Sequence, residues 1–278
     1  VINLVRTRGA KWQGAASIAD SYAFDRRNFG EVQIEASGDL AGGRFEGSAS
    51  YGGGFDDRDG NGSRVRTSPQ GLVTRSADLD SHGEGYGWGL SGTYTRPLLG
   101  GTLKANGHLG GNNFSHNEVR QITVPSRSVD TGHDSFDFLS PEAGLDFKRP
   151  LSGGTDLNLV FLTKGFDMGI VSLYRPPGQV SRFSLDQNTT ETVVRSVLTH
   201  RQGPNVSFET GVETALNTLE SATSYLDNGQ VVDLPSANVE VREVRNQAFG
   251  KAIWRPVPKW TVEAGLGYEV SSLTASRD

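Results

Sequence analysis

The chain has 278 residues, of which 35% are hydrophobic and 21% charged, and its net charge is −5. It contains no cysteine, which excludes disulfides and thiolate metal sites, and it has no basic cluster, so no nucleic-acid partner is expected. No apolar run approaches the ~18 residues that a membrane helix needs, so a helical membrane protein is excluded. A β-barrel is not excluded, because its strands show only short alternating segments.

Alternation of apolar and polar residues predicts eleven strands. Most have 12 to 15 residues, more than the ~5–6 typical of soluble proteins and enough to cross a bilayer. They are expected near residues 11–23, 29–41, 44–55, 83–97, 101–114, 136–149, 155–168, 190–202, 205–219, 238–255 and 259–272.

The expected connections alternate between two kinds. Tight turns rich in glycine and proline, such as Ala41-Gly42-Gly43 and Leu99-Gly100-Gly101, join one set of strand ends. The other ends are joined by the short segment 25–28 and by four polar, aperiodic stretches, at residues 56–82, 115–135, 169–189 and 220–237. Short turns on one side and long loops on the other are typical of outer-membrane barrels and not of Greek-key sandwiches.

The two faces of the expected strands differ in polarity. Between Gly85 and Thr95, the residues Tyr86, Trp88 and Leu90 fall on one face, and small or polar residues fall on the other. In several other strands the second face carries glutamate, which is costly against a dry core and inexpensive in a wet lumen. We therefore predict an all-β, antiparallel, up-and-down transmembrane β-barrel.

One stretch has the spacing of a calcium loop. Asp57, Asp59 and Asn61 place oxygen ligands at alternate positions, and Gly62 is the sixth residue. The twelfth position is Ser68 instead of glutamate, and no flanking helices are expected. Two interpretations stay open, namely a calcium site that stiffens an external loop and an exposed polar loop without an ion.

The remaining residues form no recognisable catalytic pattern. The five histidines are scattered and are expected in loops or in the lumen, with His116 and His133 in one predicted loop. We find no catalytic constellation and no cofactor motif, so the chain is expected not to be an enzyme. The sequence names no ligand-binding residue and assigns no metal site.

The opening segment, Val1-Ile2-Asn3-Leu4-Val5-Arg6-Thr7-Arg8-Gly9, resembles the end of the plug domain in TonB-dependent outer-membrane receptors. In that family a similar strand leads directly into the barrel. Arg6 and Thr7 stand in swapped order relative to the usual phrase. The succession of hairpins with short turns and long loops is similar to that family over the remaining length.

The resemblance implies a division of the chain and a function. Residues 1–10 would be the last plug strand and its linker, and residues 11–278 the N-terminal half of a barrel of about 22 strands. The expected function is TonB-driven import of a siderophore, vitamin or carbohydrate across a Gram-negative outer membrane. The expected partners are outer-membrane lipid, the TonB complex and that small-molecule ligand. The alternatives are a passive porin-like barrel and a soluble β-rich binding or adhesion protein.

Overall fold

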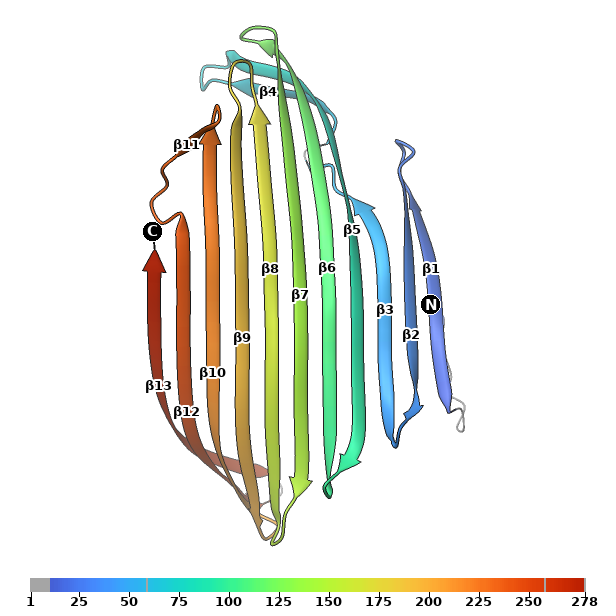
Figure 1. Cartoon of the computed structure of the whole chain (residues 1–278), viewed down its shortest axis with the longest axis vertical. Coiled ribbons are helices and arrows are strands. Elements are labelled where there is room, and N and C mark those ends of the chain that lie inside the picture. Colours follow the sequence, from blue (N-terminus) through green and yellow to red (C-terminus); the bar gives the residue numbers. More distant parts are fainter. Residues whose placement is uncertain (1–10, 59, 258, 278) are drawn as a thin grey trace.

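The computed structural model describes residues 11–58, 60–257 and 259–277. This part of the chain is one antiparallel sheet of thirteen strands (Figure 1). The prediction for residues 1–10 lies outside the described residues. The strands are β1 (Trp12–Tyr22), β2 (Asn28–Leu40), β3 (Gly43–Phe55), β4 (Gly62–Thr67), β5 (Val73–Leu98), β6 (Gly101–Val124), β7 (Ser128–Pro150), β8 (Thr155–Arg175), β9 (Ser181–Gln202), β10 (Val206–Asp227), β11 (Gln230–Val232), β12 (Asn238–Val257) and β13 (Trp260–Arg277).

The strands follow one another in the sheet in the order of the sequence. The path runs β1-β2-β3-β5-β6-β7-β8-β9-β10-β12-β13, with β4 beside β5 and β11 beside β10. Eleven strands were expected, and each of them corresponds to a strand on this path. The two strands that the sequence did not predict, β4 and β11, have only six and three residues and are exposed throughout. The all-β, up-and-down antiparallel prediction is confirmed. Among the described residues, none forms a helix that could cross a membrane.

The tight turns lie where the sequence predicts them. Between β2 and β3, Ala41 and Gly42 have φ angles of 46° and 80°, and between β5 and β6, Leu99 and Gly100 have 48° and 73°. Two successive positive φ angles define the two-residue hairpin turn whose twist matches that of the flanking strands. Glycine at the second position of each turn adopts this conformation without steric cost.

The predicted long loops are corrected. Strands contain all of residues 73–82, 115–124, 128–135, 169–175, 181–189 and 220–227, so that β5, β6 and β7 have 26, 24 and 23 residues. The pairing of β5 with β6 continues past Gly85↔Phe114 to Ser81↔Glu118. The backbone ladder does not need an apolar face once both faces are in water, and the periodicity therefore ends before the strand does.

The sheet has an apolar face and a polar face. Trp88, Leu90 and Leu266 lie on the apolar face and are 38%, 50% and 83% exposed. Lipid contact replaces water on this face, and each such side chain gains about 1.5–3 kcal/mol when it leaves water. The polar face includes Glu35, Ser50 and other paired residues of the opposite parity. This arrangement agrees with the predicted division between a lipid side and a lumen side.

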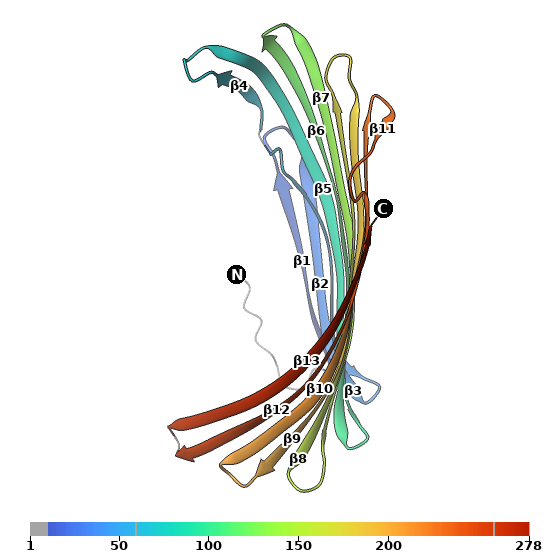
Figure 2. The ribbon, with the colours of Figure 1, turned by 90° about the vertical axis from the view of Figure 1, so that its left-hand side faces the viewer.

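The sheet is strongly curved (Figure 2). Along β5, residues 77–89 alternate between shielded odd positions and exposed even ones, which identifies the polar face as the concave one. Among the described residues, Ala77, Leu79 and Ile122 form a small buried apolar cluster near the external ends of β5 and β6. There is no second layer of structure in the described chain, so its apolar stabilisation depends on the membrane.

Candidate functional site

A gap in the sheet lies at its external end, beside β5. β3 ends with the pair Phe55↔Glu84, and β4 begins with Gly62↔Leu79. Residues 80–83 of β5 therefore have no strand partner on that edge. The connection between β3 and β4, of which residues 56–58 and 60–61 are described, fills this gap. We call it the 56–61 connection.

Side chains in the 56–61 connection replace the missing strand. The amide N–H of Ser81 donates to Asn61 Oδ1 over 2.6 Å, and that of Gly83 donates to Asp57 Oδ1 over 3.0 Å. The amide of Asp56 donates to the Gly83 carbonyl over 3.1 Å. Asp57 and Asn61 thus satisfy backbone groups of β5 that would otherwise lose their ladder partners.

Arg27, in the turn between β1 and β2, ties three segments together. Its Nε lies 2.6 Å from Asp25 Oδ2, and its Nη2 lies 2.6 Å from Asp57 Oδ2. Its Nη1 donates to the Gly83 carbonyl over 3.0 Å, and the guanidinium lies 4.9 Å from the centre of the Phe55 ring. We call Asp25, Arg27 and Asp57 the Arg27 clamp. It joins the first turn, the 56–61 connection and β5.

The Arg27 clamp shifts the acidity of its members. The hydrogen bond from Arg27 holds the pKa of Asp57 below its ordinary value, and the Gly83 amide acts in the same direction. The backbone amide of Arg27 lowers the pKa of Asp25, and the bond to Asp57 raises the pKa of Arg27. All three groups therefore keep their charges at neutral pH.

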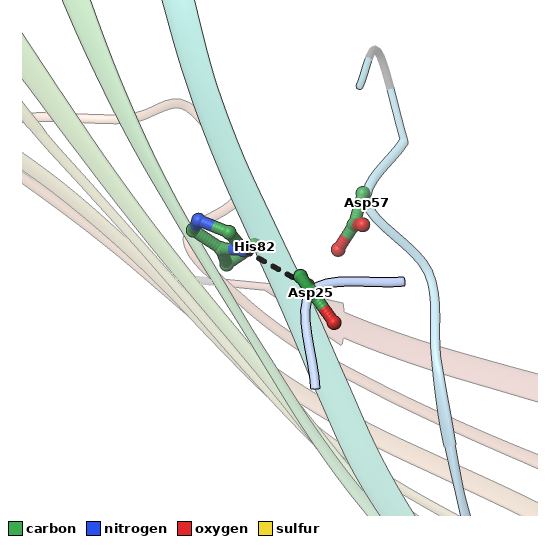
Figure 3. Close-up of side chains that lie close together, drawn as sticks. All are labelled: Asp25, Asp57 and His82. Atoms are coloured by element: carbon green, nitrogen blue, oxygen red, sulfur yellow. Dashed lines mark ion pairs between the residues drawn. The ribbon is translucent and has the colours of Figure 1, made fainter. Parts of the chain in front are cut away.

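Asp25, Asp57 and His82 lie close enough together to hold a cation (Figure 3). One possible ligand atom from each lies within 4.8 Å of the others. His82 also has Asp80 near it, at 2.8 Å from Nε2. However, both carboxylates already bind the guanidinium of Arg27, which supplies the positive charge at this point. The chemistry of this group is that of an ion-pair network.

The three residues of the calcium hypothesis have separate positions. Asp59 lies outside the described residues. Asp57 uses its oxygens for Arg27 and Gly83, and Asn61 uses Oδ1 for Ser81. Both interpretations stay predictions, and these contacts favour the one without an ion, because the Asp57 oxygens and Asn61 Oδ1 already bind partners within the chain. The competing interpretation, a polar loop, now has a structural role, because these side chains close a gap in the sheet.

Ser81 and His116 lie directly beneath the 56–61 connection. Ser81 Oγ donates to the Asp57 carbonyl over 2.7 Å and lies 2.8 Å from His116 Nε2. His116 Nδ1 lies 3.9 Å from Asp134 Oδ2, and Asp134 forms an ion pair with Arg58 of the connection. Contacts that lead from a serine to a histidine and from the histidine to an aspartate are those of a hydrolase triad. Ser81 is fully buried and gives its proton to a backbone carbonyl, so this chain of contacts acts as a second anchor for the connection.

The histidine prediction is corrected by this arrangement. His116 is a buried residue of β6, and His133 lies on β7, where Nδ1 is 2.8 Å from Asn117 Oδ1. The two histidines do not share a loop. The prediction failed because residues 115–135 lack an apolar face although they continue two paired strands.

Further charges on the concave face are also paired. Asp130 is 2% exposed, and it accepts hydrogen bonds from Arg75 Nη2 and Tyr174 Oη, each over 2.7 Å. Arg120 forms an ion pair with Glu118 and lies 5.5 Å from the centre of the Tyr174 ring. The external part of the concave wall is therefore a rigid polar surface held by cross-strand pairs.

Comparisons with known proteins find similar folds only. No family model matches the chain, and no curated protein matches it. The outer-membrane protease OmpT from Escherichia coli is 12% identical, with 94% of each chain covered and a TM-score of 0.30. The Pseudomonas putida toluene transporter TodX is 8% identical, with 96% of this chain and 87% of TodX covered and a TM-score of 0.29. A deltaS2 mutant of TodX, described as a monoaromatic hydrocarbon channel, is also 8% identical, with 96% of this chain and 88% of the mutant chain covered and a TM-score of 0.27.

The expectation that this chain is not an enzyme is contradicted by the first of these structures, which is a protease. We withdraw that expectation, since a barrel architecture does not exclude catalysis. At 12% identity and a TM-score of 0.30, the likeness assigns no reaction to this chain.

The location follows from the sheet itself. Its strands are long enough to cross a bilayer, its convex face is apolar, and its backbone groups are paired from strand to strand. In hydrocarbon, a spanning β-structure of this kind is viable only as part of a closed barrel, and bacterial barrels of this kind lie in the outer membrane. The protein belongs in a Gram-negative outer membrane.

Proposed function

We propose that this chain is the N-terminal half of the barrel of an outer-membrane receptor that imports a scarce ligand with energy supplied by TonB. The observation that carries the proposal is the state of the two sheet edges. β1 and β13 are the first and the eleventh strand of an all-antiparallel path, so they run in the same direction. Neither has a second partner strand among the described residues.

The unpaired edges of β1 and β13 indicate that further strands complete the barrel. An unpaired edge cannot face hydrocarbon, because each unsatisfied N–H or C=O costs several kcal/mol. Pairing β1 with β13 would make a parallel contact in an otherwise antiparallel sheet. An odd number of additional strands restores an antiparallel closure, and eleven more strands would make the 22-stranded barrel that surrounds a plug. The plug-like segment Val1–Gly9 supports the same proposal.

The polar concave wall suits such a receptor. Its external part is held rigid by the Arg27 clamp and by the Ser81–His116–Asp134 contacts. A rigid polar wall keeps a water-filled entrance open and gives a plug domain a surface with which to form hydrogen bonds.

Uptake and conductance of the full-length protein test this proposal. We expect cells that produce it to accumulate a radiolabelled ferric siderophore, cobalamin or disaccharide only when TonB is present. We also expect the purified protein to be non-conducting in planar bilayers, because a plug fills its lumen. Accumulation that is independent of TonB, together with a steady open conductance, would favour a passive porin and contradict the proposal.

A further inference from the structure

A hollow of about 460 Å³ lies on the concave face, next to the 56–61 connection. It spans four neighbouring strands, β2, β3, β5 and β6. Its volume falls in the range of small-molecule sites, roughly 300–1,000 Å³. No member of the Arg27 clamp lines it. The Arg27 clamp therefore does not account for the hollow.

The hollow exists because its floor has no side chains. Four glycines occupy strand positions at which a side chain would face the concave side, namely Gly52, Gly54, Gly85 and Gly87. At Gly54, an added Cβ would meet nothing within 4 Å, and at Gly87 it would meet only Asn112 Nδ2 at 3.4 Å and the Gly111 carbonyl at 3.7 Å. Neither position has a positive φ. At Gly54 and Gly87, neither packing nor backbone conformation requires glycine, although glycine weakens a strand, whereas at Gly85 an added Cβ would lie 2.6 Å from the Asn113 carbonyl oxygen. What glycine does provide is close access to the strand surface.

The walls carry an aromatic ring and hydrogen-bonding groups. The Phe114 ring stands at one side, with the Arg58 guanidinium 6.0 Å from its centre. Asn112 offers an amide and Ser50 a hydroxyl, so donors and acceptors are both present. The side chain of Glu31 lies across Gly52, where an added Cβ would approach Glu31 Cγ to 3.0 Å.

We propose that this hollow is a binding subsite for an uncharged sugar unit. A sugar ring presents a flat C–H face that packs on an aromatic ring, and its hydroxyls match carboxylate, amide and hydroxyl partners. The residues that line the hollow include the acidic Glu31 and Asp56 and no lysine or arginine, and the charge of the neighbouring Arg58 is paired with Asp134, so an anionic ligand is disfavoured. The inference rests on the proposed function, since it takes the concave face as the lumen of a receptor.

Binding to the full-length protein in detergent tests the subsite. The probes are maltose, cellobiose and chitobiose in calorimetry, with glucose 6-phosphate as an anionic comparison. We expect at least one disaccharide to bind, and Gly54→Leu, which fills the hollow, to weaken its binding by ten-fold or more. Phe114→Leu keeps an apolar side chain, removes the ring and should weaken binding similarly.

Gly30→Leu is the matched control. An added Cβ at Gly30 also meets nothing within 4 Å, but Gly30 does not line the hollow. This variant should bind within two-fold of the unchanged protein. A heat-modifiable gel shift verifies that each variant is folded. The subsite is refuted if no disaccharide binds or if glucose 6-phosphate binds more tightly than every disaccharide. It is also refuted if Gly54→Leu and Gly30→Leu bind the disaccharide equally well.

The two proposals fail separately. TonB-dependent uptake that Gly54→Leu leaves unchanged would keep the receptor and remove the subsite. Disaccharide binding that Gly54→Leu abolishes, in a protein whose uptake is independent of TonB, would keep the subsite and remove the TonB-dependent function.

Discussion

Replacing Arg27 with alanine should open the external end of the sheet locally. Arg27 donates to Asp25, Asp57 and the Gly83 carbonyl, and its side chain is only 17% exposed. A hydrogen bond to a charged group contributes about 1.5–3 kcal/mol when it is shielded, but water can partly replace the lost partners at this surface. We therefore expect a loss of about 2–3 kcal/mol in local stability for the whole substitution, less than the sum of its bonds. That loss corresponds to roughly a 30- to 150-fold change in the opening equilibrium.

Amide hydrogen exchange measures this opening directly. The Ser81 and Gly83 amides bind the 56–61 connection, so their protection should fall by that factor in Arg27→Ala and by less in Arg27→Lys. Arg44→Ala is the control, because the Arg44–Glu46 ion pair is exposed and such pairs contribute about 0–1 kcal/mol. Protection at Gly83 that changes by less than three-fold in Arg27→Ala, or equally in both alanine variants, would refute the role of Arg27.

Three further predictions concern the faces of the sheet and the 56–61 connection. A spin label at Leu90 should be relaxed by lipid-soluble oxygen and one at Ser91 by an aqueous reagent, and the reverse pattern would contradict the strand register. Calorimetry should show no calcium heat that Asp57→Ala removes, since Asp57 already binds Arg27 and Gly83; a heat lost in that variant would establish the ion site. The pKa of Asp57 is lower in the folded state than its ordinary value of 3.8, so its charge contributes stability above that pH. Protection of the Gly83 amide should therefore fall as the pH decreases below about 4, and Asp57→Asn should lack this dependence.

The membrane part of each strand could be predicted because its signal is local. Lipid on one side and water on the other impose a period of two, which Tyr86, Trp88 and Leu90 show directly. The turns at Gly42 and Gly100 were equally readable, because a positive φ favours glycine. These two local signals were sufficient for the order, the direction and one end of every strand on the main path.

The external ends could not be predicted in the same way. From Gly83 back to Thr74, Leu79 is the only large apolar side chain of β5, yet the strand continues to Ser76 through its pairing with β6 and to Val73 through its pairing with β4. Backbone pairing holds these residues, and backbone groups are the same in every sequence. β4 was missed for the same reason, since Gly62–Thr67 is exposed throughout.

The sequence by itself determined an antiparallel sheet of long strands, its lipid-facing residues and its tight turns, because each of these depends on neighbours in the chain. Only the tertiary structure decided the sites. Arg27, Asp57 and Gly83 are distant in sequence and meet because the register of β2, β3 and β5 brings their ends together. The glycine-floored hollow arises likewise, since Gly52 lies opposite Gly87 and Gly54 opposite Gly85 only when β3 pairs with β5. Contacts of this kind depend on strand register, and no pattern within a single strand encodes them.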